Sequence, residues 1–191
     1  MNYLPRIISL MAIVYCLGCC PDKESPGLPP ITSEGKNTFA CKINGEVFVA
    51  DGSGTNTPNA GIYAIMETDF DTLGSFLPQD SSDFWLVAEN GKQIVSFFIN
   101  SPLSVGKHNF SANTYIYPIV VRPKNYGEVS RSGKNFITTS VDTGSLFITR
   151  CDRTRFIISG TFQFKAKNLS SKAETVEVTE GRFDLDYSKT H

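Results

Sequence analysis

The sequence predicts an all-β fold, an antiparallel β-sandwich of about ten strands, with a partly open β-barrel as the alternative. Three observations lead to this prediction. Short segments that alternate between apolar and polar residues recur along the chain, two Asn-Gly pairs separate neighbouring segments, and hardly any segment has apolar residues at helical spacing. Strands without helices between them pair with their neighbours in antiparallel sheets.

The first expected element is a β-hairpin near the start of the folded part. Residues 37–43 and 46–50 both alternate, and Asn44-Gly45 stands between them. A type I′ turn needs a positive φ at both central residues, which Asn and Gly tolerate best. The sequence therefore predicts a two-residue turn here.

Further strands are expected through the middle of the chain. A second pair, Asn90-Gly91, predicts a hairpin between residues 84–89 and 93–100. A polar loop with four aspartates, residues 68–83, precedes this hairpin. The remaining strands expected in this part are residues 62–67, 114–121, 135–141 and 145–151.

The C-terminal segments form the most regular expected element. Residues 155–167 alternate throughout, and Gly160 within them predicts a bend or a bulge. Residues 175–187 continue the alternation on both sides of an expected turn at Glu180-Gly181. We expect this ribbon to form the spine of the core.

The N-terminal residues 1–18 have the pattern of an export signal. Arg6 precedes the apolar run 7–17, and the small residue Gly18 follows it. A run of this length fits a secretory signal, because a membrane-spanning helix needs about 20 apolar residues. The mature protein is therefore expected outside the cytoplasm.

The end of this leader resembles a bacterial lipobox, in which the cysteine after the cleavage point carries the lipid. Cys19 follows the small Gly18 and is the expected lipid attachment site; Cys20, with Leu17 at the apolar lipobox position, is the alternative. Two or three acyl chains would anchor the protein stably, since each buried methylene contributes about 0.8 kcal/mol. We expect an outer-membrane lipoprotein of the cell envelope, facing the periplasm or the exterior.

Composition sets the organisation after the leader. Residues 19–36 are rich in proline and charge and are expected to be a flexible linker, which leaves residues 37–191 as a single β-domain. Hydrophobic residues make up 40% of the chain, enough for a core, and 18 Lys and Arg oppose 19 Asp and Glu without a basic run. Nucleic-acid binding is not expected, because it needs a clustered positive surface.

Motifs at both ends of this domain carry a resemblance. They are Asn37-Thr38-Phe39 with Ile43-Asn44-Gly45, and Ile158-Ser159-Gly160-Thr161-Phe162 with Val178-Thr179-Glu180-Gly181-Arg182-Phe183-Asp184. These motifs resemble a Bacteroidetes lipoprotein family of unknown function, and residues 51–134 carry no matching motif. The resemblance implies an extracytoplasmic β-domain and no particular activity.

Two cysteines lie inside the expected domain. In an oxidising compartment Cys41 and Cys151 are expected to form a disulfide, and two buried free thiols are the alternative. The sequence has no C-x-x-C pair and no Cys/His ligand set, so no metal and no cofactor are expected.

Residues with catalytic chemistry are few. His108 lies in a turn-like stretch and is expected to be a solvated loop residue, and no nucleophile or zinc-protease motif occurs. One acidic cluster remains, which a glycosidase could use as its carboxylate pair or calcium as oxygen ligands: Asp69, Asp71, Asp80 and Asp83. Its spacing matches no calcium loop. An enzyme is therefore not expected, with a carbohydrate hydrolase as the alternative.

Three tyrosines give the better binding hypothesis. Tyr115 and Tyr117 alternate on an expected strand, and Tyr126 lies in a turn after Pro123. If exposed together, these rings could stack on a sugar or on a partner's side chain, although core packing or isolated exposure explains them as well. The expected function is a non-enzymatic binding or interaction module for a glycan, peptide or protein, and a purely structural envelope component is a third reading.

Overall fold

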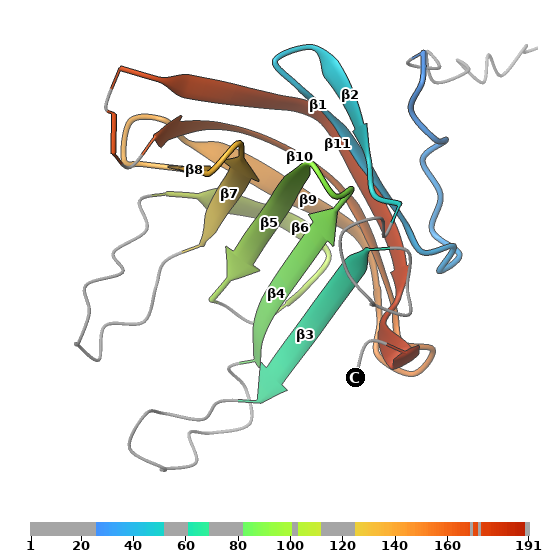
Figure 1. Ribbon diagram of the computed structural model, residues 1–191. Coiled ribbons are helices and arrows are strands. Elements are labelled where there is room, and N and C mark those ends of the chain that lie inside the picture. Colours follow the sequence, from blue (N-terminus) through green and yellow to red (C-terminus); the bar gives the residue numbers. More distant parts are fainter. Residues whose placement is uncertain are drawn as a thin grey trace, which may run out of the picture.

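The computed structural model shows one antiparallel β-sheet that curls around an apolar core (Figure 1). It describes residues 26–51, 61–68, 82–100, 103–111, 125–168, 170–171 and 173–189. The strands are β1 (Thr38–Ile43), β2 (Glu46–Val49), β3 (Ile62–Thr68), β4 (Ser82–Glu89), β5 (Gln93–Ile99), β6 (Gly106–Phe110), β7 (Tyr126–Arg131), β8 (Lys134–Ile137), β9 (Gly144–Asp152), β10 (Ile157–Asn168) and β11 (Thr175–Asp186). A 3-10 helix, η1 (Tyr187–Lys189), follows, and the described residues contain no α-helix. The all-β prediction is confirmed.

The sheet branches at β10, which pairs with two different strands, β9 and β8, along one edge. Its main order is β2-β1-β11-β10-β8-β7-β5-β4-β3, while β9 also pairs with β10, and β6 with β9. β10 has β11 along one edge; on the other edge it pairs with β9 up to Phe164 and with β8 at Lys167 and Asn168. Figure 1 shows the long β10 and β11 as one wall and the shorter β3, β4 and β5 as the wall opposite.

A cluster of phenylalanine rings joins these two walls. Phe97 of β5 lies with its ring centroid 5.4 Å from Phe162 of β10 and 5.6 Å from Phe183 of β11. Phe39 of β1 and Phe110 of β6 also contact Phe97, and all five rings are almost fully buried. The sheet therefore curls into a half-barrel. The β10–β11 ribbon contributes to this core as predicted.

Both Asn-Gly hairpins form, with different turns. Asn44 and Gly45 have φ values of 51° and 84°, as the predicted type I′ turn requires. In the β4–β5 turn Gly91 has a positive φ of 72°, and Asn90 acts through its side chain, whose Oδ1 accepts the backbone N–H of Gln93 at 3.1 Å. The second turn is therefore held by an Asn side chain rather than by two left-handed residues.

The prediction of a turn at Glu180-Gly181 is wrong, because β11 continues through these two residues as one strand with a bulge. Thr179 and Glu180 together face a single residue of β10, and Glu180 has a φ of 52°. A Cβ atom at Gly181 would lie 2.5 Å from the ring of Phe162. Gly181 therefore allows a close approach of strand and ring instead of a chain reversal.

The predicted irregularity at Gly160 is confirmed. The β9–β10 register shifts between Ser159 and Gly160, and a Cβ at Gly160 would lie 2.4 Å from the carbonyl oxygen of Phe147. Two strands were not expected from the sequence, β6 and β7. The expected strand 114–121 lies outside the described residues.

Residues 26–36, here called the N-terminal strap, are hydrogen-bonded to the sheet. The flexible linker predicted for residues 19–36 therefore does not extend over residues 26–36. The buried Asp184 of β11 accepts hydrogen bonds from Thr32 Oγ1 at 2.6 Å, from the backbone N–H groups of Glu34 and Gly35 at 2.9 and 2.8 Å, and from Ser159 Oγ at 2.7 Å. Prolines fix part of the strap's backbone, and one carboxylate then satisfies its polar groups.

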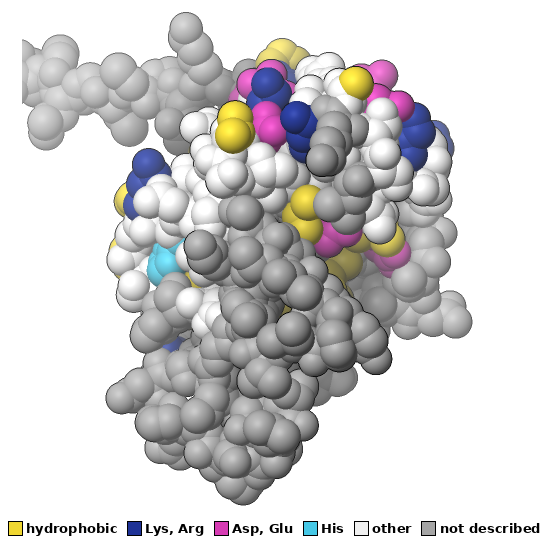
Figure 2. Space-filling view, turned by 90° about the vertical axis from the view of Figure 1, so that its left-hand side faces the viewer, with side chains coloured by type: hydrophobic (Ala, Val, Ile, Leu, Met, Phe, Trp, Pro, Cys, Tyr) yellow, Lys and Arg dark blue, Asp and Glu magenta, His cyan; other side chains and the backbone are white. Residues whose placement is uncertain are grey.

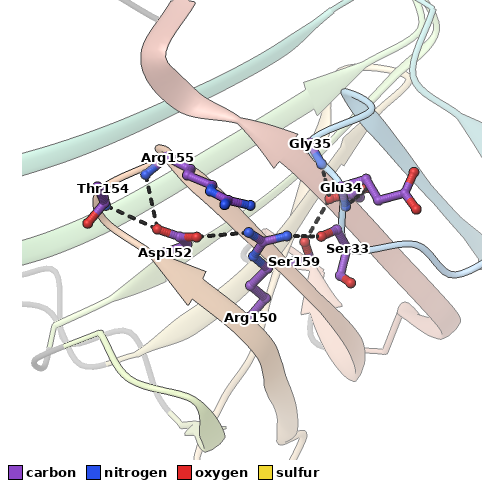
Figure 3. A network of polar contacts seen from close by, with 9 residues as sticks. Ser33, Glu34, Gly35, Arg150, Asp152, Thr154, Arg155 and Ser159 are labelled. Carbon is purple, nitrogen blue, oxygen red and sulfur yellow. Dashed lines mark hydrogen bonds and ion pairs between the residues drawn. The ribbon is translucent and has the colours of Figure 1, made fainter.

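A second contact ties the strap to β9 (Figure 3). The Arg150 guanidinium donates to the backbone oxygen of Ser33 and, at 2.8 Å, to the Asp152 carboxylate. Asp152 also accepts the backbone N–H groups of Thr154 and Arg155 in the β9–β10 turn. The strap is therefore part of the folded domain.

Candidate functional site

The outer surface of β4, β5 and β7 carries a row of aromatic rings. Trp85, Phe98 and Tyr126 are directly opposite one another in register. The rings of Phe98 and Tyr126 stack with centroids 5.6 Å apart, and Trp85 at the end of the row is 42% exposed. We call this row, with its exposed neighbours Tyr63 and Ile94, the aromatic face.

The alternation of β4 explains why these rings point outward. Phe84, Leu86 and Ala88 are buried in the core, so Trp85 and Val87 lie on the opposite surface. A sheet surface turned away from the core normally carries polar side chains. Large apolar side chains are therefore unusual on this surface.

A carboxylate lies beside the aromatic row. Tyr63, Val87, Ser96 and Glu128 form the next row of the same surface. Burial raises the pKa of the Glu128 carboxyl above its ordinary value. Within the described part of the chain Glu128 has no ion pair, so its oxygens remain available as acceptors beside the rings.

The structure places one of the three predicted stacking tyrosines on this face. Tyr126 begins β7 instead of lying in a turn, and it is half-buried against Phe98. Tyr115 and Tyr117 lie outside the described residues. Sequence reasoning missed Trp85 and Phe98, because both belong to apolar runs in which either face could have been the buried one.

The two domain cysteines are free thiols in the structure. Because β11 and β10 lie between β1 and β9, Cys41 and Cys151 are three strand spacings apart across the sheet, about 14 Å, and the register also offsets them along the strands. The longest Cα separation of a disulfide is about 6.8 Å. Burial raises the pKa of the Cys41 thiol to about 12. The predicted disulfide is therefore not formed in this fold, and Cys41 packs as a small apolar residue.

The other predicted residues do not form a site in the described structure. His108 is buried in β6 instead of solvated, and its Nε2 lies 2.9 Å from the backbone oxygen of Ser104. Asp83 belongs to β4, and its side chain, like Asp69, Asp71, Asp80, Cys19 and Cys20, lies outside the described residues. No cluster that could hold a metal ion is found among the described residues.

Fold and face together define the class: an all-β domain, curled into a half-barrel, with aromatic rings on the outside of one wall. Residues 76–184, more than half of the chain, match the family described as Domain of unknown function (DUF6252), so the chain belongs to that family. No curated protein and no solved structure matches the chain. The described part of the protein contains no helix that could cross a membrane.

Proposed function

We propose that this protein is a lipid-anchored, non-enzymatic binding module of the bacterial cell envelope, and that its aromatic face binds a glycan. The row of Trp85, Phe98 and Tyr126 carries this proposal. The C–H groups of a sugar ring pack well on an aromatic face, whose electrons attract the slightly positive hydrogens. The Glu128 oxygens beside the row would accept sugar hydroxyls.

The size of the exposed surface favours a glycan over a protein partner. Trp85, Tyr63 and Ile94 are each about 40% exposed, which amounts to roughly 200–300 Å² if a large side chain offers about 150–250 Å². A standard protein interface buries about 800 Å² on each partner. The face therefore fits a narrow ligand better than a second protein.

Two carboxylates lie on this surface. Glu128 on β7 and Glu89 on β4 are separated by two strand spacings and by one row along the strands, which places their Cα atoms about 12 Å apart. The two carboxyl groups of glycosidases are about 5–9.5 Å apart, a separation that two Glu side chains on such Cα atoms can also reach. A carbohydrate hydrolase is the alternative, and release of reducing ends from a bound glycan would favour it.

The N-terminal sequence supports the anchor. The leader 1–18 and the lipobox-like Gly18-Cys19 are typical of exported lipoproteins, and the motifs named above resemble Bacteroidetes lipoproteins. We therefore place the protein in the outer membrane, facing the periplasm or the exterior, with its lipid on Cys19 or, as the alternative, on Cys20.

A glycan array followed by titration of the hits tests the function. Trp85 is the only tryptophan, so its fluorescence should change on binding. Trp85→Ala should weaken binding at least about fivefold, because a stacked ring contributes about 1–3 kcal/mol by alanine substitution in comparable stacking sites. The matched control is Phe147→Ala, another half-exposed ring that lies on β9. An array without hits, or equal losses of affinity in both variants, would contradict a glycan site on this face. If the immobilised protein instead retained an envelope protein, and Trp85→Ala abolished that retention, the partner would be a protein.

A further inference from the structure

A pocket continues the aromatic face at the end where the hairpin turns lie. Glu89, Ile94 and Ser130 form the row beyond Val87, Ser96 and Glu128 on the same surface. This row borders a depression of about 280 Å³ between the β4–β5 and β7–β8 turns, lined among others by Lys92, Gln93, Arg131 and Lys134. That volume is just below the range of complete ligand sites, about 300–1,000 Å³, so the pocket suits one ring-sized group.

One acceptor atom on this surface lacks a donor. Glu89 Oε1 is buried and has no hydrogen-bond partner, whereas Gln93, whose Oε1 also lacks a partner, alternates with Ile94 and so turns its side chain to the core side of β5. Carboxylate and amide oxygens only accept hydrogen bonds, and nearly all buried polar atoms in proteins are paired. A ligand with hydroxyl groups would supply the missing donor.

The rim of the pocket is positively charged. Lys92 is exposed and has no ion pair with any described residue, while Arg131 reaches Glu46 only at 4.0 Å. Lys134 is paired with Glu174 at 2.8 Å. Figure 2 shows Lys and Arg side chains next to Asp and Glu side chains toward the upper end of its visible face. Lys92 is thus available to attract an anionic group.

We infer that the pocket binds an acidic sugar residue of a glycan whose chain lies along the aromatic face. A uronic acid or sulfated sugar combines a hydroxyl donor for Glu89 with an anion for Lys92. Glu89 lies four residue steps after Trp85 on β4, about 13 Å along the strand. The ligand is therefore an oligosaccharide, and this inference rests on the proposed glycan function of the same face.

The first test is an array that contains neutral glycans together with their uronic acid and sulfated counterparts. The full mature chain should prefer the acidic members, and the preference should weaken as salt rises, since salt screens exposed charges. Binding to neutral members alone would overturn the acidic-sugar inference and leave the glycan function standing. An array on which no member binds would overturn both.

Two variants separate the pocket from the rings. Lys92→Gln should lower affinity for the acidic glycan by up to about fivefold, as expected for one exposed ion pair, and leave its neutral counterpart unaffected. Lys107→Gln, an exposed lysine on β6, is the control. Glu89→Leu should weaken binding of both glycans and raise the melting temperature, because it removes a buried acceptor without a partner. An unchanged acidic preference in Lys92→Gln, or unchanged affinity in Glu89→Leu, would contradict the inference.

Discussion

At the residue scale, Asp184 holds the N-terminal strap against the sheet. Burial alone would raise the pKa of this carboxyl, but hydrogen bonds from Thr32, the Glu34 amide, Ser159 and the Gly35 amide outweigh burial and hold it below the ordinary value. A carboxylate that accepts several donors is strongly stabilised as the anion. This one buried charge therefore holds the strap against the outer surface of β10 and β11.

Asp184→Asn should lower the free energy of unfolding at pH 7 by about 2–4 kcal/mol, because an amide NH₂ group would face donors that now meet a charged oxygen. Glu34→Gln removes the same charge from a carboxylate whose side chain is 68% exposed and should have little effect. Denaturant unfolding of the three proteins measures both values. Equal stability of Asp184→Asn and wild type would mean that the strap is not held by this carboxylate.

The same variant should change the dependence of stability on pH. Because the folded pKa of Asp184 lies below the unfolded one, its contribution is present above the ordinary value of about 3.9 and is lost as pH falls through the lowered pKa. The stability difference between wild type and Asp184→Asn should therefore be largest near neutral pH and shrink below about pH 4. A difference that grows in acid would contradict the sign of the shift.

At the element scale, the strands show what the sequence could predict. The hairpin of β1 and β2 follows from local signals, alternation and an Asn-Gly turn, and it forms as predicted. β6 has the sequence Gly-Lys-His-Asn-Phe, which resembles a turn; it is a strand because it pairs with β9, far away in sequence. Such pairing comes from the tertiary fold and leaves no local pattern.

The aromatic face could not be predicted from the sequence for the same reason. In Phe84-Trp85-Leu86-Val87 every residue is apolar, so the sequence does not tell which side of β4 is buried. The contacts of Phe97 with the opposite wall decide this, by turning the inner face of β5 and its neighbour β4 toward β10 and β11. Only Tyr126 could be proposed from sequence, as one of three tyrosines.

The bulge in β11 gives a prediction for an element. Gly181→Ala places a methyl group against the Phe162 ring and should destabilise the fold by about 1–3 kcal/mol, as overpacking does. Glu177→Ala, at an exposed site of the same strand, is the control and should stay within about 0.5 kcal/mol. Thermal unfolding compares the two. A neutral Gly181→Ala would show that Phe162 moves freely, against its tight packing with Phe39 at 4.9 Å.

At the scale of the whole molecule, the strap and the aromatic face lie on opposite walls. The strap binds Asp184 on the outer surface of β11, whereas Trp85 lies on the outer surface of β4, across the phenylalanine core. Seven residue steps lead from Cys19 to Pro26, at most about 25 Å of extended chain. A lipid on Cys19 would therefore hold the domain close to the membrane by its β11 wall.

This geometry predicts that anchoring leaves the aromatic face open to solvent. Because Trp85 is the only tryptophan and is 42% exposed, iodide should quench its fluorescence equally well in the free protein and in the lipidated protein on vesicles. Vesicles made with brominated lipids, which quench only at the bilayer, provide the control and should have no effect. Quenching by these lipids, or protection from iodide on anchoring, would place the aromatic face against the membrane; that result would make lipid, not a glycan, the natural partner of Trp85.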